Sequence, residues 1–269
     1  MAADIKQLRT RIKSVDSTLH LTKAMGLVAS SKIRKATDSM NKGKQYANAF
    51  EETVGLLASY KECQKSPYMK HRCSENEKLC LVVIAGDRGL AGGYNANIFR
   101  LLREFEGAEI IPIGKRACER FGGKFIGAEA FKYADAKEIA DTICKDFVDE
   151  KFDRFGIVCT KYNSLMSQEA YVKWVLPLAK DEQIKSASAI FEPDEITVLN
   201  SIIPDYVAGI IISAVKESFA SEVAARRVAM DSAGKNAQEM IDRLGLEYNR
   251  ARQGSITQEI TEIVAGSGI

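Results

Sequence analysis

Proline is scarce in this sequence and is absent from both of its ends. The five prolines stand at positions 67, 112, 177, 193 and 204, so neither the first 66 residues nor the last 65 contain one. Proline inside a helix removes a backbone hydrogen bond and clashes with the preceding turn. Its absence from both ends therefore predicts two very long helices, one at the start of the chain and one at its close.

Residue types that carry catalysis and metal binding are also scarce. The chain has two histidines, His20 and His71, and contains no G-x-S-x-G, H-E-x-x-H or C-x-x-C pattern. Neither histidine is placed to join a catalytic triad with a nucleophile in the middle of the chain. The sequence thus gives no support for an enzyme active in isolation, and we expect no cofactor and no metal. The six cysteines are expected to be free thiols in a reducing compartment: Cys63, Cys73, Cys80, Cys118, Cys144 and Cys159.

Long apolar runs are missing as well. The longest uncharged apolar run, near residues 207–215, falls far below the roughly 20 residues that span a bilayer, so direct bilayer insertion is not expected. The N-terminus is basic and amphipathic, as organellar transit sequences are. Its apolar repeat nevertheless starts at Ile5 and continues without a break, so we assign these residues to the folded protein.

The first of the two helices carries a heptad pattern. Sixteen positions recur at alternating steps of three and four, and thirteen of them are apolar, where the 46% hydrophobic composition predicts about seven. They are Ile5, Leu8, Ile12, Val15, Leu19, Thr22, Gly26, Ala29, Ile33, Ala36, Met40, Gly43, Ala47, Phe50, Val54 and Leu57. A strict 3.5-residue repeat of this length predicts a left-handed coiled-coil seam on a helix of roughly 80 Å.

The last part of the chain offers a partner for that helix. Its apolar positions are Ile212, Val215, Phe219, Val223, Met230, Ala233, Ala237, Met240, Leu244, Tyr248 and Ala251. Pro204 and Asp205 predict the start of this helix, since Pro is tolerated and Asp favoured in a first turn. Because one helix opens the chain and the other closes it, we expect an antiparallel pair with the intervening residues forming a separate body.

The middle of the chain alternates between strand and helix patterns. Strands are predicted at 79–86, 109–114, 155–162 and 168–176, with helices at 96–106, 115–121 and 136–150, after a linker at 61–78. This alternation is typical of an α/β sheet with crossover helices. We therefore predict an α/β protein with three domains: an N-terminal coiled-coil helix (1–59), a Rossmann-like α/β domain (75–190) and a C-terminal coiled-coil helix (204–269).

A glycine-rich segment follows the first predicted strand, where α/β folds place their ligands. Its glycines at 86, 89, 92 and 93 give G-x-x-G-x-x-G-G, which is neither the dinucleotide fingerprint nor a phosphate-binding P-loop. A tight connection between strand and helix is the simpler interpretation. Asp87 and Arg88 then become structural or interfacial residues.

Charge is distributed unevenly along the chain. Residues 1–45 hold ten Lys or Arg against three Asp, a local charge of +7 in a chain of net charge +2. This favours an acidic partner for the first helix, although a solvated coiled-coil face would have the same composition. Nucleic acid is not the expected partner, because the basic residues alternate with the seam instead of preceding it as in basic-zipper proteins. A structural coiled-coil scaffold with an α/β interaction domain remains the alternative.

Three motifs carry a resemblance to a known family. They are LTKAMGLVASSKIRKA at 21–36, DRGLAGGYNANIF at 87–99 and YNRARQGSITQEITEIVAGSG at 248–268. Together, and in order over essentially the whole chain, they resemble the gamma subunit of the rotary F-type ATP synthase. The resemblance implies a non-catalytic central-stalk rotor that couples ion flow through the membrane ring to ATP synthesis or hydrolysis.

The resemblance also implies partners, a location and contact residues. The partners are the alpha and beta subunits of the catalytic hexamer, the epsilon subunit and the membrane-embedded c-ring, with the protein peripheral on the cytoplasmic face of a bacterial membrane. By resemblance Lys23, Met25 and Arg226 lie near an acidic segment of a beta subunit. Further contacts with partners are implied for Arg252, Gln253, Thr257 and Glu259, which match positions facing a beta loop.

Overall fold

The computed structural model describes residues 2–72, 77–123, 126–179 and 191–266. Their contacts separate the chain into two compact units. The terminal unit comprises Met1–Ser30 with Arg226–Ile269, and the central unit comprises Ser31–Ala225. Helices α1 (Ala2–Ser59) and α5 (Glu195–Gly266) contribute to both units. The three-domain division at 1–59, 75–190 and 204–269 groups the residues differently and stays a prediction.

The predicted seam of α1 is confirmed by burial. All sixteen heptad positions are buried or half-buried. In the terminal unit a Cβ built on Gly26 would lie 3.7 Å from the Cβ of Met230, and one on Gly234 would lie 3.6 Å from Oγ1 of Thr22. Facing residue numbers therefore rise along α1 as they fall along α5, so the two helices are antiparallel there, as predicted.

The same pairing is found inside the central unit. A Cβ built on Gly43 would lie 3.5 Å from the Cα of Ser213, and one on Gly209 only 2.9 Å from Cε1 of Tyr46. In both units the numbers of facing residues add up to about 256. At Gly43 and Gly209 a larger residue would therefore require its neighbours on the other helix to move, whereas at Gly26 and Gly234 an added Cβ would make an ordinary contact.

The predicted start of the second helix is wrong. Helix α5 begins at Glu195, and Pro204 lies inside it. Asp194 forms the N-terminal cap, because its Oδ1 accepts the backbone N–H of Thr197 at 2.8 Å and its Oδ2 accepts the Thr197 hydroxyl at 2.9 Å. These bonds hold the pKa of the Asp194 carboxyl below its usual value. An interior proline costs a helix about 3 kcal/mol, and full burial of neighbours such as Ile203 offsets this.

In the described part of the central unit, four strands form one sheet. They are β1 (Leu79–Ile84), β2 (Glu109–Ile113), β3 (Arg154–Tyr162) and β4 (Gln168–Leu176), in the order β2-β1-β3-β4. Strand β1 is parallel to both of its neighbours, whereas β4 returns antiparallel to β3. The turn at 163–167 is too short for the crossover that a parallel partner requires. The predicted α/β fold and all four strands are confirmed.

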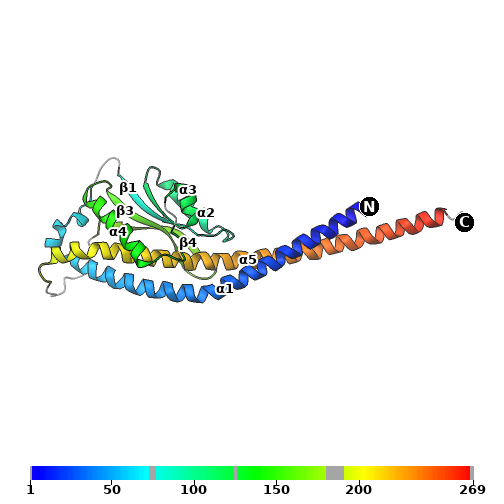
Figure 1. Cartoon of the computed structure of the whole chain (residues 1–269), viewed down its shortest axis with the longest axis horizontal. Coiled ribbons are helices and arrows are strands. Elements are labelled where there is room, and N and C mark those ends of the chain that lie inside the picture. The colour runs from blue at the N-terminus through cyan, green and yellow to red at the C-terminus, as the bar shows by residue number, and fades with distance from the viewer. Residues whose placement is uncertain (1, 73–76, 124–125, 180–190, 267–269) are drawn as a thin grey trace. The chain divides into compact units, whose positions relative to one another are not determined.

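Helices cover both faces of this sheet (Figure 1). Alternate residues of β1 enter two cores: Val82 and Ile84 join the core that contains α1, α5 and α4 (Tyr133–Val148), while Leu81 and Val83 join the one that contains α2 (Tyr94–Leu101) and α3 (Lys115–Phe121). Because successive side chains of a strand point to opposite faces, a strand buried on both sides is apolar throughout. The unbroken apolar run of β1 is explained in this way.

The connections between these elements contain short 3-10 turns. The predicted linker at 61–78 includes η1 (Glu62–Lys65) and η2 (Pro67–Met69), and η3 (Leu102–Glu104) follows α2. The linker is bonded to α5 where the Ser66 hydroxyl donates to Oδ1 of Asn200 at 2.6 Å. Segments of three or four residues show no periodicity, which is why the sequence pattern does not reveal them.

We expect Gly114→Ala to destabilise the protein severely. Gly114 has φ of +90°, and an added Cβ would lie 1.9 Å from the carbonyl oxygen of Ala85. The substitution combines left-handed strain with a backbone clash, so we expect a loss of at least about 3 kcal/mol in the free energy of unfolding. Chemical denaturation followed by circular dichroism measures this.

Gly107→Ala is the matched control for this substitution. Gly107 has a similar φ of +85°, but an added Cβ would meet nothing within 4 Å. Strain without a clash costs about 1 to 2 kcal/mol. Equal losses for the two variants would contradict the predicted clash at Gly114.

Candidate functional site

The glycine-rich segment at 86–95 connects β1 to α2. Leu90 and Gly92 both have positive φ, 61° and 58°, which accounts for the tight turn. Gly86 lies against α5, because a Cβ there would be 2.8 Å from the carboxyl carbon of Glu222. Glycine at 86 is therefore required by packing against a helix, a contact that the simpler interpretation of the motif, a tight connection between strand and helix, did not include.

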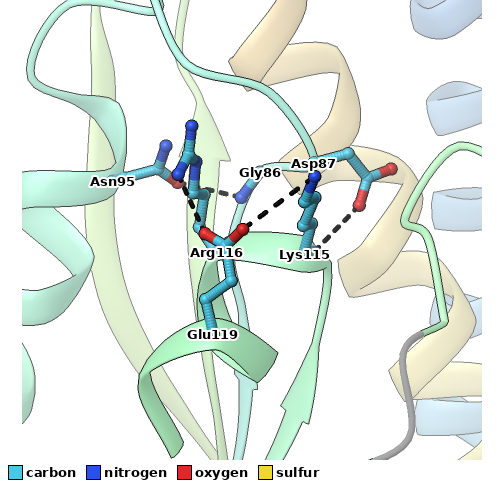
Figure 2. Close-up of polar contacts among 6 residues, drawn as sticks. All are labelled: Gly86, Asp87, Asn95, Lys115, Arg116 and Glu119. Atoms are coloured by element: carbon cyan, nitrogen blue, oxygen red, sulfur yellow. Dashed lines mark hydrogen bonds and ion pairs between the residues drawn. The ribbon is translucent and has the colours of Figure 1, made fainter.

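Asp87 is a clamp for three backbone amides. Its Oδ1 accepts the N–H groups of Lys115 at 3.1 Å and Ala128 at 3.2 Å, and its Oδ2 accepts that of Glu129 at 3.3 Å. Figure 2 shows the carboxylate turned toward Lys115, the first residue of α3. Asp87 thus joins the end of β1 to two other segments of the central unit.

Two backbone amides at this turn that could bind a phosphate donate within the chain instead. Phosphate sites use free amides at the start of a helix. Here the Lys115 amide donates to Asp87, and the Gly86 amide donates to Oδ1 of Asn95 at 2.9 Å (Figure 2). The negative charge of Asp87 would also repel a phosphate. This arrangement is that of a structural connection.

The surface beside the clamp is charged. Arg116 donates to Oε2 of Glu119 at 2.8 Å, and Lys115 forms a looser ion pair with Glu119 at 3.9 Å (Figure 2). The Arg88 side chain is exposed. Of the two turn residues predicted to contact partners, Arg88 therefore presents its side chain to the surface, whereas the carboxylate of Asp87 faces the chain's own amides.

Three predicted contact residues lie in the terminal unit, near a groove between its helices. Lys23 is exposed, and Met25 and Arg226 are half-buried. The groove has a volume of about 460 Å³, and Lys23, Gly26, Met230 and Gly234 are among its lining residues. Gly26 and Gly234 add no side chain to its wall.

The remaining predicted contact residues lie on the last turns of α5. Arg252, Gln253, Thr257 and Glu259 are all exposed, and the Thr257 hydroxyl donates to the Gln253 carbonyl at 2.9 Å. Since facing residue numbers add up to about 256, α5 beyond residue 254 extends past the first residue of α1 that the structure describes. By that sum Arg252 and Gln253 lie opposite the first residues of α1, whereas Thr257 and Glu259 lie beyond the pairing that the structure describes.

An apolar stripe on the same turns was missed by sequence reasoning. Ile256, Ile260 and Ile263 are 46%, 57% and 70% exposed. Their spacing of four and three residues puts them on one helix face, and that spacing is the signal that could have identified them. Exposed apolar residues gathered on one helix face indicate a surface that another molecule covers.

The cysteines that the structure describes are packing residues of the interior. Cys63, Cys80, Cys144 and Cys159 are buried and Cys118 is half-buried, all as free thiols, while Cys73 lies outside the described residues. Burial raises the pKa of Cys80, Cys144 and Cys159 to about 12. Few of these thiols are thiolates near neutral pH, so they are poor nucleophiles. Among the described residues, no group of three or more His, Cys, Asp or Glu side chains could hold a metal ion.

One described helix is apolar enough to be compared with a membrane span. Helix α5 contains an 18-residue window of mean hydropathy 1.7, and 67% of that window is buried within the chain. The buried core helix of a water-soluble domain has the same properties, so this is weak evidence for membrane insertion. The expectation of no direct bilayer insertion stays a prediction.

Comparison with known proteins gives a family for the whole chain. A family model described as ATP synthase matches residues 4–268. The ATP synthase gamma chain of Ruminococcus albus is 41% identical over 283 aligned residues, which cover 98% of both chains. The chain belongs to the ATP synthase gamma chain family. A second member, from Acetobacterium woodii, is 35% identical over 99% of both chains and is named a sodium-ion-specific ATP synthase gamma chain.

The fold is also that of a solved relative. A chain in a cryo-EM structure of the mitochondrial ATP synthase of Euglena gracilis, in rotational state 3, aligns with a TM-score of 0.67. The alignment covers all of this chain and 97% of the other at 20% sequence identity. This alignment therefore supports the fold. The family rests on the sequence comparisons, which confirm the resemblance carried by the three motifs.

We predict that the glycine-rich turn binds no nucleotide. Calorimetric titration of the whole chain with ATP, ADP and NAD is expected to give no binding heat, because the Gly86 amide donates to Asn95, the Lys115 amide donates to Asp87, and the charge of Asp87 repels a phosphate. Replacing Asp87 with Asn removes the charge but keeps an acceptor, so that variant should not bind either. Micromolar affinity of the wild-type chain would overturn our interpretation of the turn.

Proposed function

We propose that this chain is the central-stalk rotor of an F-type ATP synthase. The observation that carries the proposal is the 41% identity with a gamma chain over 98% of both sequences. In this role the chain couples ion flow through a membrane ring to ATP synthesis or hydrolysis in other subunits. It is a subunit of an enzyme complex and itself catalyses no reaction.

The physical properties of the chain support a rotor. A shaft needs stiffness and asymmetry, and paired helices with an apolar seam supply the first. The glycines at 26, 43, 209 and 234 let the pair stay thin. The α/β domain, attached on one side of the central unit, makes the pair asymmetric.

The proposed partners follow from the family and from the surfaces described above. We propose that the alpha and beta subunits surround the terminal unit and that the apolar stripe at Ile256, Ile260 and Ile263 is covered by the end of their hexamer. Lys23, Met25 and Arg226 would face an acidic segment of beta. Asp87 and Arg88 would lie at an interface with a partner through the surface of their turn.

The α/β domain is proposed to face the epsilon subunit and the c-ring, and the Euglena gracilis structure is one that contains a c-ring. The chain would then be peripheral to the membrane, on the cytoplasmic face of a bacterial cell. A passive coiled-coil scaffold, the alternative function, would share the helices but would not require these particular partners.

Co-purification tests the proposal directly. A tagged chain expressed in its native host is expected to recover alpha, beta, epsilon and c-ring polypeptides in one complex, identified by mass spectrometry. The complex should hydrolyse ATP, and the purified chain without partners should not. ATP hydrolysis by the isolated chain, or recovery of a complex that lacks alpha and beta, would contradict the proposed function.

Arg252 and Gln253 distinguish a working shaft from a scaffold. An exposed Arg on a helix contributes under about 1 kcal/mol to stability, so a scaffold predicts little effect of its removal. A charge-assisted hydrogen bond to a beta loop is worth about 1.5 to 3 kcal/mol, which is roughly a tenfold to hundredfold change in one step. We therefore expect Arg252→Ala with Gln253→Ala to lower ATP turnover per assembled complex at least severalfold.

The control for this variant is Arg250→Ala, an exposed arginine on the same helix. Alanine is the best helix former, so the circular dichroism of the free chain should not change in either variant. Turnover of the double variant equal to that of wild type and of the control would mean that these side chains make no functional contact.

A further inference from the structure

Helix α5 carries a polar segment inside the central unit, at residues 217–222. Ser218 and Ser221 are fully buried, and Glu217 and Glu222 are 7% and 2% exposed. Polar side chains are rarely buried to this extent without partners. Neither the predicted contact residues nor the apolar seam accounts for this segment, which we call the α5 polar segment.

The position of the segment is explained by unequal strand lengths in the sheet. Strand β3 continues to Tyr162, but its neighbour β1 pairs with it only as far as Val158. Beyond that point the backbone groups of β3 that face away from β4 have no strand partner. Unpaired backbone groups in a buried position need another source of hydrogen bonds.

The α5 polar segment supplies those bonds. The Thr160 N–H donates to the Ser218 hydroxyl oxygen at 3.1 Å, and the Ser221 hydroxyl donates to the Thr160 carbonyl at 3.2 Å. The Tyr162 N–H donates to Oε1 of Glu217 at 3.0 Å. Helix side chains thus continue the hydrogen bonding of the sheet where β1 ends.

Three further parts of the central unit contact the same segment. The Tyr94 hydroxyl of α2 donates to the Ser218 carbonyl at 3.0 Å. Lys44 of α1 forms an ion pair with Oε1 of Glu217 at 2.8 Å. The carboxyl group of Glu222 packs beneath Gly86 of the glycine-rich turn. The sheet, α1, α2 and the glycine-rich turn all contact α5 within two helical turns.

The hydrogen bonds of the α5 polar segment resist sliding and rotation of the helix better than apolar packing does. Apolar burial is non-directional, so an apolar helix face can rotate or slide against a sheet with little change in buried area. A hydrogen bond weakens steeply with distance and angle, and a buried group that loses its partner is left unsatisfied. Directional polar contacts therefore hold one rotational register.

We propose that the α5 polar segment transmits torque between the paired helices and the α/β domain, with Glu217, Ser218 and Ser221 as positioning residues. The inference rests on the proposed rotor function, since only a rotor carries torque through this joint. When the joint yields, the helices turn without the domain that faces the ring. ATP hydrolysis then continues while ion transport falls.

The test is the ratio of ion uptake to ATP hydrolysis in the complete complex reconstituted into vesicles. Uptake of both protons and sodium ions is followed, and each rate is divided by the amount of assembled complex. We expect Ser218→Ala with Ser221→Ala to keep hydrolysis within about twofold of wild type and to lower uptake per ATP at least threefold. The matched control is Ser201→Ala with Ser232→Ala, two exposed serines of α5, which should leave the ratio unchanged.

A second pair of variants covers the case in which the serine variant does not assemble. Glu217→Gln keeps an oxygen that can accept the Tyr162 N–H, whereas Glu217→Ala removes it. We expect the Ala variant to lower uptake per ATP at least threefold and the Gln variant to retain most of it. A ratio that is the same for these two variants would overturn the inference.

The other outcomes are equally decisive. An unchanged ratio in the assembled serine variant, or a parallel fall of uptake and hydrolysis, would leave the segment with a purely structural role and overturn the inference. Failure of the rotor proposal is recognised by a separate comparison without variants. If the proposal is wrong, a complex assembled without this chain transports ions during ATP hydrolysis as well as a complex that contains the wild-type chain.

Discussion

The burial of helix α5 is the constraint on which the central unit depends. Nearly every residue from Tyr206 to Ala224 is buried, so this stretch has no solvent-facing side. A helix buried all round must be apolar wherever it meets apolar neighbours and must pair each polar group that it carries. The apolar run near 207–215 satisfies the first requirement. The α5 polar segment at 217–222 satisfies the second by bonding to the end of β3.

The close approach of the two long helices follows from the same constraint. Helix α5 cannot be covered by α1 on one side and by the sheet on another unless both lie near its axis. Gly43 and Gly209 remove side chains at facing positions of the central unit, and Gly26 and Gly234 do so in the terminal unit. Each glycine weakens helix propensity by about 1 kcal/mol. Packing along the seam offsets that cost, since helices of this length are stabilised mainly by their buried face.

The structure also shows what a motif that resembles a ligand-binding turn does in this chain. The glycine-rich turn lies where α/β proteins bind phosphates, yet its Gly86 amide donates to Asn95 and its Asp87 carboxylate accepts the amide of Lys115. The same geometry that would cradle an anion here joins β1, α3 and the turn at 127–129 into one body.

Sequence periodicity determined the elements that repeat over many residues. The heptads of α1, the four strands and α3 are confirmed because each depends on which side of a regular element is apolar. The motifs at 21–36, 87–99 and 248–268 identified the family for a similar reason, since they are local and specific. The first residue of a helix was harder to predict where the sequence departs from the usual pattern. Helix α5 begins at Glu195 because Asp194 caps it, and the cost of Pro204 inside the helix is met by burial that the sequence does not display.

Only the tertiary structure decided which distant groups meet. The three backbone N–H groups that donate to Asp87 belong to residues 28 to 42 positions further along the chain. The Thr160 N–H donates to Ser218, which is 58 positions away. Periodicity tells which face of a helix is buried but not what lies against it, so the seam was predictable and the polar joint was not. The exposed stripe at Ile256, Ile260 and Ile263 followed the apolar period like any core residue. It became recognisable as a surface only when the pairing register showed that α5 extends past the described start of α1.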